Sequence, residues 1–226
     1  MLKVGVVGLR RGMTFARIAQ IHPKTKLVAV CDIDEAKLDA AKGIEGVEAV
    51  YTEYNKFLEH DLDIVVLATG IPDHVSQTIA ALNIDKHVLC EVTAVYTLDE
   101  CEPLINAVKA SKGKYMMAEN CCFWAFIESW DEMVRQKRLG EIMYAEAEYI
   151  HDVRYLMKDA NGNPTWRAGR SPIHYCTHSL GPLLKIMDDR CISVSSLHTG
   201  SKIYPEFSKM DIEVGIFKTQ KGAVIK

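Results

Sequence analysis

The first dozen residues carry the pattern that most constrains the fold of this chain. An apolar run through Val4 and Val7 leads into glycines at Gly8 and Gly12, and an amphipathic run follows over residues 13–21. Strand, tight glycine turn and helix in this order are how a doubly wound α/β domain presents a helix N-terminus to a pyrophosphate. The usual fingerprint is G-x-G-x-x-G, and here its middle glycine is absent. An ordinary strand-to-helix turn without a cofactor is the alternative interpretation.

Composition narrows the class of protein. A chain of 226 residues can form one large domain or two ordinary ones. A net charge of −3 argues against nucleic-acid partners and anionic membranes. No apolar run approaches the roughly 18 residues of a membrane span, and no secretory signal is visible. The seven cysteines lack C-x-x-C spacing, which favours reduced thiols in a cytoplasmic protein and no metal site.

Short apolar runs alternate with helical patterns up to residue 119. After the first run, the expected strands are 26–31, 48–51, 64–68, 87–90 and 115–118. The expected helices after the first are 34–42, 54–60, 72–82 and 97–111. Thr97 and Glu100 have the spacing of a capping box at the start of the last helix. The alternation predicts a parallel sheet with right-handed crossovers, buried on both faces.

The pattern changes in the second half and predicts an α+β unit with an open antiparallel sheet. Helices are expected at 123–138 and 173–187, and strands at 191–199, 211–218 and 223–225. The alternation over 142–150 predicts a half-buried strand, again antiparallel. We therefore expect two domains, 1–119 and 120–226. The chain stops inside a strand pattern, so either a partner subunit covers the sheet edge or the sequence is a truncated piece of a longer protein, and we favour the second.

Four landmarks in order resemble the Gfo/Idh/MocA oxidoreductases, the glucose–fructose oxidoreductase and inositol dehydrogenase family. They are the glycine turn, Asp32 after the second strand, ATGIPDH over residues 68–74, and KHVLCE over residues 86–91. The resemblance implies an N-terminal Rossmann domain that binds NAD. It also implies a C-terminal open sheet that contacts a small-molecule carbohydrate substrate and forms a homo-dimer or tetramer. Members of the family are longer than this chain, which agrees with truncation.

Asp32 lies 20 residues after Gly12, where an acidic group binds the ribose 2′-hydroxyl and repels a 2′-phosphate. This position favours NAD over NADP, although a solvated carboxylate is the alternative, and Arg10 and Arg11 could instead meet a phosphate. The expected cofactor-binding residues are Gly8, Leu9, Arg10, Arg11, Gly12, Asp32, Thr69, Gly70, His74, Glu91 and Asn120.

Two positions depart from the family pattern. The family typically reads Glu-Lys-Pro where this chain has Glu91-Val92-Thr93, and Val92 cannot donate a proton. Proton transfer must then come from another residue. His174 and His178 have i, i+4 spacing, which on one helix puts both side chains over the same spot. We predict His178, Tyr175 and His174 as catalytic residues. A metal site and histidines without a role are the alternatives, and no carboxylate companion for a metal is evident.

The motifs at 91–92, 118–122, 151–154 and 175–182 resemble a branch of the family that includes NAD-dependent α-N-acetylgalactosaminidases. That branch, as the resemblance implies, oxidises a sugar hydroxyl, eliminates the glycosidic bond and reduces the ketone again. His151, Arg154, Trp166 and Arg167 are the expected sugar contacts, with packing under a loop as the alternative for Trp166. The leading hypothesis is an NAD-dependent oxidoreductase acting on a sugar or cyclic polyol. The others are a glycoside-cleaving enzyme with the same first step and a non-catalytic dinucleotide sensor.

Overall fold

The computed structural model describes residues 1–206, 208 and 210–226. The chain divides into two compact units, an N-terminal unit, Met1–Ala118, and a C-terminal unit, Glu119–Lys226. This division falls one residue before the domain boundary expected from the sequence. No helix of the described residues combines the length and the apolar character needed to cross a bilayer.

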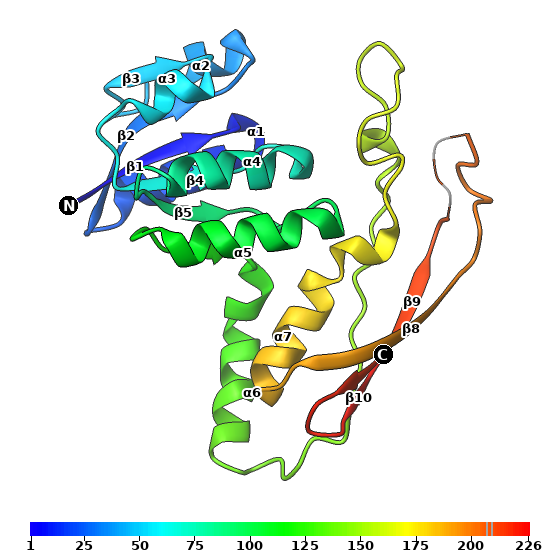
Figure 1. Ribbon diagram of the computed structural model, residues 1–226. Coiled ribbons are helices and arrows are strands. Elements are labelled where there is room, and N and C mark those ends of the chain that lie inside the picture. Colours follow the sequence, from blue (N-terminus) through cyan, green and yellow to red (C-terminus); the bar gives the residue numbers. More distant parts are fainter. Residues whose placement is uncertain (207, 209) are drawn as a thin grey trace. The chain divides into compact units, whose positions relative to one another are not determined.

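The N-terminal unit is a parallel six-stranded sheet with strand order β3-β2-β1-β4-β5-β6 (Figure 1). Its strands are β1 (Leu2–Val7), β2 (Thr25–Cys31), β3 (Ala49–Tyr51), β4 (Ile64–Leu67), β5 (His87–Cys90) and β6 (Tyr115–Met117). Its helices are α1 (Leu9–Ile21), α2 (Glu35–Ala41), α3 (Tyr54–Leu58), α4 (Ile71–Leu82) and α5 (Cys101–Ala110). The predicted parallel sheet is confirmed. The strand order reverses at β1, between β2 and β4, which is where doubly wound folds bind their ligands.

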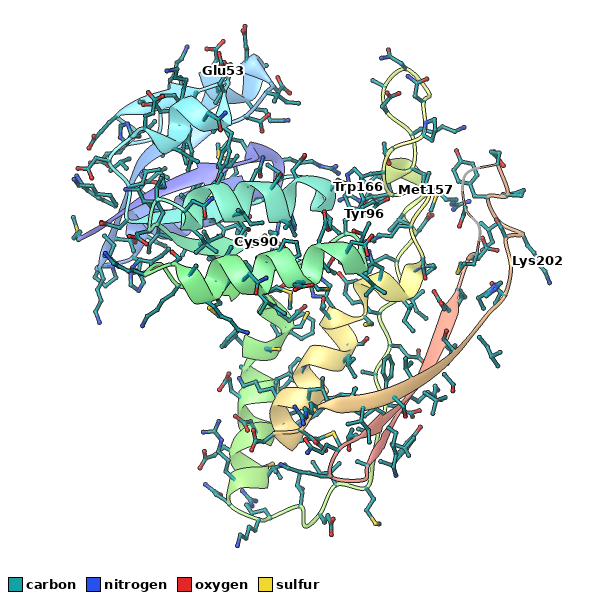
Figure 2. All side chains as sticks on the ribbon, in the orientation of Figure 1. Glu53, Cys90, Tyr96, Met157, Trp166 and Lys202 are labelled. Carbon is teal, nitrogen blue, oxygen red and sulfur yellow. The ribbon has the colours of Figure 1, made fainter. Side chains whose placement is uncertain are left out.

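Both faces of this sheet are covered by apolar clusters. Successive side chains of a strand point to opposite sides, so one strand contributes to both clusters. Val6 and Val4 pack in one apolar cluster with Leu27 and Val30, whereas Val7 belongs to a second. That second cluster also contains Phe57, Leu67 and Cys90. Cys90 lies on β5 (Figure 2), and burial raises the pKa of its thiol to about 12. The packed strands give the loops at their carboxyl ends a rigid base.

Helix α1 begins earlier than the sequence pattern indicates. We expected a turn from Gly8 to Gly12, but the helix already starts at Leu9. Leu9 is buried, and a Cβ at Gly12 would lie 2.7 Å from Val6 Cγ1. The short glycine run therefore packs the first helical turn directly onto β1, and Gly8 alone makes the turn.

The expected helix over 97–111 has its predicted start. Thr97 and Glu100 form a capping box, in which the Thr97 and Tyr96 N–H groups donate to Glu100 Oε2 at 3.0 and 2.6 Å. A 3₁₀ turn at Leu98–Glu100 then leads into α5.

The C-terminal unit pairs two helices with a four-stranded sheet of order β7-β10-β9-β8 (Figure 1). The helices α6 (Ala125–Arg135) and α7 (Thr177–Met187) pack against each other. The strands are β7 (Tyr144–Ala145), β8 (Cys191–His198), β9 (Glu213–Thr219) and β10 (Val224–Ile225). The described residues of this unit also form short 3₁₀ helices at Asn120–Phe123, Arg154–Leu156 and Pro172–Tyr175.

The prediction of an antiparallel strand over 142–150 is wrong in length and direction. Only Tyr144 and Ala145 form a strand, and they pair in parallel with β10. The partner strand contains only Val224 and Ile225, so the ladder stops after the Ala147 N–H donates to Lys226 O at 3.2 Å. The sheet is consequently mixed, with antiparallel pairing kept between β8, β9 and β10.

Candidate functional site

Gly8 shapes the turn between β1 and α1. Its φ of +83° lies in the left-handed region that favours glycine. A Cβ there would lie 2.5 Å from Ala68 O and 2.8 Å from Thr69 N, so the loop after β4 packs onto the bare glycine. The Leu9 N–H donates to Asp32 Oδ2 and the Gly12 N–H to Gly8 O. The remaining first-turn N–H groups, those of Arg10 and Arg11, are the ones that a helix N-terminus offers to an anion.

Asp32 is buried and holds the α1 N-terminus. Its Oδ2 accepts the Leu9 N–H at 2.6 Å, and its Oδ1 accepts the Asp34 N–H at 2.9 Å. Lys37 Nζ lies 3.5 Å from Oδ1. An ionised carboxylate has about four acceptor positions, so these partners leave capacity for ribose hydroxyl groups. Together with the crowded Gly8 turn, this donor and acceptor set fits a dinucleotide.

The Arg11 side chain forms an ion pair with a carboxylate directly after β5. Its Nε donates to Glu91 Oε1 at 2.7 Å, and its guanidinium lies 5.5 Å from the centre of the Phe15 ring. The Val92 N–H donates to Glu91 Oε2 at 3.2 Å. This ion pair gives the Arg11 side chain a partner other than a phosphate.

His74 lies in the first turn of α4, inside the helix predicted over 72–82, and its side chain is fully buried. Its Nδ1 lies 2.7 Å from Thr93 O and its Nε2 lies 3.3 Å from Thr69 O. Burial lowers the pKa of His74, so the ring is neutral at pH 7 and donates one hydrogen bond, by the shorter distance from Nδ1. The ring ties the loop after β4 to the segment after β5.

In the C-terminal unit, His178 is paired with a buried carboxylate. His178 Nδ1 lies 2.7 Å from Glu119 Oε1, and the two side chains are 7% and 6% exposed. Burial by itself raises the pKa of the Glu119 carboxyl, but hydrogen bonds from His178 and neighbouring groups outweigh it and bring the pKa below its usual value. The Cys121 N–H also donates to Oε1 at 3.1 Å. Glu119 is therefore ionised at neutral pH and fixes the ring of His178.

Aromatic rings surround the His178 imidazole. The Tyr149 ring centre lies 4.5 Å from it and the Tyr175 ring centre lies 5.1 Å from it. Tyr149 also lies 4.4 Å from the His151 ring. The predicted residues His151, Tyr175 and His178 are thus brought together around Tyr149.

The expected pairing of His174 with His178 on one helix is wrong. His174 lies in the 3₁₀ helix Pro172–Tyr175, and His178 lies in the first turn of α7, which begins at Thr177. A 3₁₀ helix has three residues per turn rather than 3.6, so i, i+4 positions on the two sides of the junction do not share a face. The close partner of His178 is Glu119.

A cavity of 770 Å³ lies within the C-terminal unit. His151, Arg154, Arg167 and Tyr175 all line it. Arg154 forms a two-pronged ion pair with Asp152, at 2.9 Å from Nε and 2.6 Å from Nη2. Arg167 stacks on the Trp166 ring at 4.0 Å. Trp166 and Met157 both lie on the segment between β7 and α7 (Figure 2).

Sequence reasoning missed Glu119, Cys121 and Tyr149. The run AENCC over residues 118–122 is part of the family resemblance, which predicts a role only for Asn120, an exposed residue at the start of a 3₁₀ helix. Tyr149 was included in the predicted strand over 142–150. Glu119 and His178 are 59 residues apart, so no local spacing joins them. The one sequence signal for Glu119 is that it is an acidic residue directly after the last predicted strand of the first half.

Comparisons with known proteins agree with this architecture. Residues 2–119 match the Gfo/Idh/MocA family model, described as an oxidoreductase family with an NAD-binding Rossmann fold. A glycosyl hydrolase family 109 protein of Solibacter usitatus is 28% identical over all of this chain and 60% of its own length. An alpha-N-acetylgalactosaminidase of Shewanella oneidensis is 29% identical over 99% of this chain and 57% of its own length. The chain therefore spans less than two thirds of these curated relatives.

Solved structures share the fold. A myo-inositol 2-dehydrogenase of Lactobacillus plantarum aligns with a TM-score of 0.82 and 20% identity, over 99% of this chain and 68% of its own. A scyllo-inositol dehydrogenase of Lactobacillus casei, solved with NAD(H) and scyllo-inositol, aligns with a TM-score of 0.80 and 20% identity over the whole of this chain and 68% of its own. At this identity the likeness concerns the fold alone.

Proposed function

This chain belongs to the Gfo/Idh/MocA family of oxidoreductases with an NAD-binding Rossmann fold, and on that premise we propose that it oxidises a hydroxyl group of a sugar or cyclic polyol. NAD, when bound, supplies the acceptor for the hydride. The activity, the substrate and the assembly described below are parts of this proposal.

The N-terminal unit holds the cofactor. Gly8 admits the pyrophosphate, and the N–H groups of Arg10 and Arg11 donate to it. Asp32 accepts hydrogen bonds from the adenosine ribose and disfavours a 2′-phosphate by its charge. The ordering of the loops after β4 and β5 by His74 and by the Arg11–Glu91 pair supports this assignment. The remaining assigned cofactor-binding residues of this unit are Leu9, Gly12, Thr69 and Gly70, and Asn120 of the C-terminal unit is a further candidate.

His178 removes the proton of the reacting hydroxyl. Because Glu119 Oε1 accepts from Nδ1, the neutral ring carries its lone pair on Nε2, where it can take a proton. The ionised Glu119 then stabilises the imidazolium. Tyr175 packs beside the ring and is the candidate proton donor, with His174 as a further candidate. Val92, at the position of the family lysine, takes no part in proton transfer.

The buried His178–Glu119 hydrogen bond is the observation that carries this proposal, because a paired neutral imidazole is the arrangement of a general base. A His178→Ala variant is expected to lose about 10²–10⁴-fold in turnover, the usual share of a general base, while NAD binding measured by fluorescence titration stays unchanged. His198→Ala, at an exposed position on β8, is the matched control. Unchanged turnover in His178→Ala would remove the base assignment.

Glycoside cleavage is the second candidate. The names of the curated relatives favour it, and so does Val92 in place of the family lysine. It would use the same first step, followed by elimination of the glycosidic bond. Release of nitrophenol from nitrophenyl α-N-acetylgalactosaminide without net NADH formation would select this function. Net NADH formation from free sugars or polyols selects the dehydrogenase, and NAD binding with neither activity selects a dinucleotide sensor.

We also propose that the outer face of the C-terminal sheet meets a second copy of this chain in a dimer or tetramer. Val214 and Ile216 on β9 are exposed, whereas Gly215 between them is buried. Leu197 of β8 is the register partner of Val214 and is 82% exposed. An open apolar sheet face of this kind is typical of an association surface.

A further inference from the structure

Three side chains of different chemistry converge beside the proposed base. A carboxylate oxygen of Glu119, the Cys121 Sγ and the His178 Nδ1 all lie within 4.8 Å of one another. The separations are 2.7 Å from Nδ1 to Oε1 and 3.4 Å from Nδ1 to Sγ. The second carboxylate oxygen, Glu119 Oε2, is buried and has no hydrogen bond of normal geometry among the described residues, and the Thr177 hydroxyl is its nearby polar neighbour. Since the Glu119 side chain is only 6% exposed, this oxygen is a buried acceptor that a cation could satisfy.

The local structure holds these groups together. Glu119 and Cys121 are two residues apart at the start of one 3₁₀ helix, where the Cys121 N–H donates to Glu119 Oε1. His178 lies in the first turn of α7, which packs against that same 3₁₀ helix. The donors therefore come from two elements already in contact.

We propose that Glu119, Cys121 and His178 form a binding site for a thiophilic divalent cation, with Zn²⁺ as the best match. Nitrogen, sulfur and oxygen donors together are a ligand set that zinc accepts, and three protein ligands leave the fourth tetrahedral position open. Zinc bonds of about 2.0–2.3 Å put neighbouring donors roughly 3.3–3.7 Å apart. The Nδ1–Sγ separation already has this value, and the Nδ1–Oε1 pair has to open by less than about 1 Å. A thiolate and a carboxylate neutralise the ion, so no net charge is buried.

Binding of the metal ion releases one proton. The Cys121 thiol loses its proton to solvent and forms the Zn–S bond. His178 changes tautomer through solvent: Nδ1 gives up its proton, Nε2 takes one up, and the Nδ1 lone pair of the still neutral ring forms the Zn–N bond. No electron transfer is involved. The Nδ1–H···Oε1 hydrogen bond is then lost and Nε2 carries the proton, so zinc inhibits whichever reaction uses His178 as its base. This inhibition rests on the proposed function, whereas the binding does not.

The test is a zinc titration of the purified, chelator-treated protein by isothermal calorimetry. The wild type is compared with Cys121→Ser and with Cys122→Ser, a matched control that removes the adjacent thiol outside the cluster. We expect Cys121→Ser to bind Zn²⁺ at least about 10-fold more weakly, since even changes outside a ligand set have effects of that size. Cys122→Ser is expected to bind as the wild type does. Co²⁺ added to the wild type and to Cys122→Ser should give a thiolate-to-cobalt charge-transfer band that Cys121→Ser lacks.

Equal zinc affinity in the wild type and Cys121→Ser would overturn the site, as would the cobalt band surviving in Cys121→Ser. Stimulation of turnover by zinc would overturn the inhibitory role. The two proposals fail separately. A protein that turns over no substrate, yet shows Cys121-dependent zinc binding, loses the proposed function and keeps the site.

Discussion

Single residues in this chain carry two tasks at once. The sequence indicates Asp32 as a ribose ligand, and the structure adds that its carboxylate accepts the Leu9 N–H and so caps α1. The sequence could not show this second task, because the cap lies 23 residues from the N–H that it satisfies. The same holds for Glu119 and His178. Local spacing found the histidine, but its partner is set by the packing of α7.

Replacing Asp32 with alanine is expected to weaken NAD binding about 10-fold, the value of roughly one hydrogen bond to a charged group. NADP binding should weaken less, because the substitution also removes a charge that repels the 2′-phosphate. Fluorescence titration with both cofactors measures the ratio. Asp34→Ala removes the neighbouring cap of α2 and is expected to leave the ratio unchanged. An equal loss for both cofactors in Asp32→Ala would contradict the ribose assignment.

His74 should make the N-terminal unit sensitive to acid. The pKa of His74 is lowered in the folded state because the ring is buried. Below the ordinary histidine pKa of about 6.5, the unfolded state therefore binds a proton that the folded state does not bind until lower pH. The stability that the neutral His74 ring contributes is then fully present above pH 6.5, and the free energy of unfolding falls as the pH decreases below that value. Urea unfolding at pH 7.5 and pH 5.5 measures the slope.

His74→Gln is less stable at both pH values but is expected to show a smaller decrease between them. The exposed His22→Gln variant controls for removal of a histidine as such and should keep the wild-type slope. If His74→Gln keeps that slope as well, the acid sensitivity comes from another group.

At the scale of elements, the sequence predicts the type of most helices and strands but not how they begin or pair. The alternating and apolar patterns of the first half set all six strands of the parallel sheet near their observed positions. The start of α1 was misplaced, because packing of Leu9 and Gly12 on β1 extends the helix into the glycine run. The segment 142–150 has a strand pattern, but its pairing depends on a partner strand of two residues.

The β1–α1 junction depends on Gly8. Gly8→Ala places a methyl group against Ala68 O and requires a left-handed backbone, which together should reduce the free energy of unfolding by about 3 kcal/mol. Chemical denaturation measures this loss. Gly43→Ala is the control, because a Cβ there meets nothing within 4 Å, and it is expected to change stability by less than about 0.5 kcal/mol. A similar loss of stability in both variants would contradict the claim that the close contact and the left-handed backbone at Gly8 cause the loss.

At the scale of the whole molecule, the sequence supports two units of different architecture because the first half alternates strands and helices and the second half does not. It could not provide the parallel pairing of β7 with β10, which joins residues 80 apart. It also could not provide the cavity of the C-terminal unit, whose lining comes from four separate stretches of the chain.

The proposed assembly can be tested at the exposed sheet face. Leu197→Glu puts a charge on that face, and burying an unpaired charge in an interface is costly. Light scattering after gel filtration should show a shift from oligomer to monomer. Ile33→Glu, at a residue that is 91% exposed in the N-terminal unit, is expected to leave the mass unchanged. A wild-type protein that is already monomeric would rule out the assembly.

The pairing of β7 with β10 has a consequence for the order of folding. Tyr144 forms its strand only with Val224, and β10 also stands between β7 and β9. During synthesis, the C-terminal sheet therefore cannot close until residue 224 has left the ribosome. Every strand of the N-terminal sheet is present by residue 117, so this unit can fold first. The Rossmann unit can therefore be folded while about a hundred further residues are translated, before the C-terminal unit completes its own core.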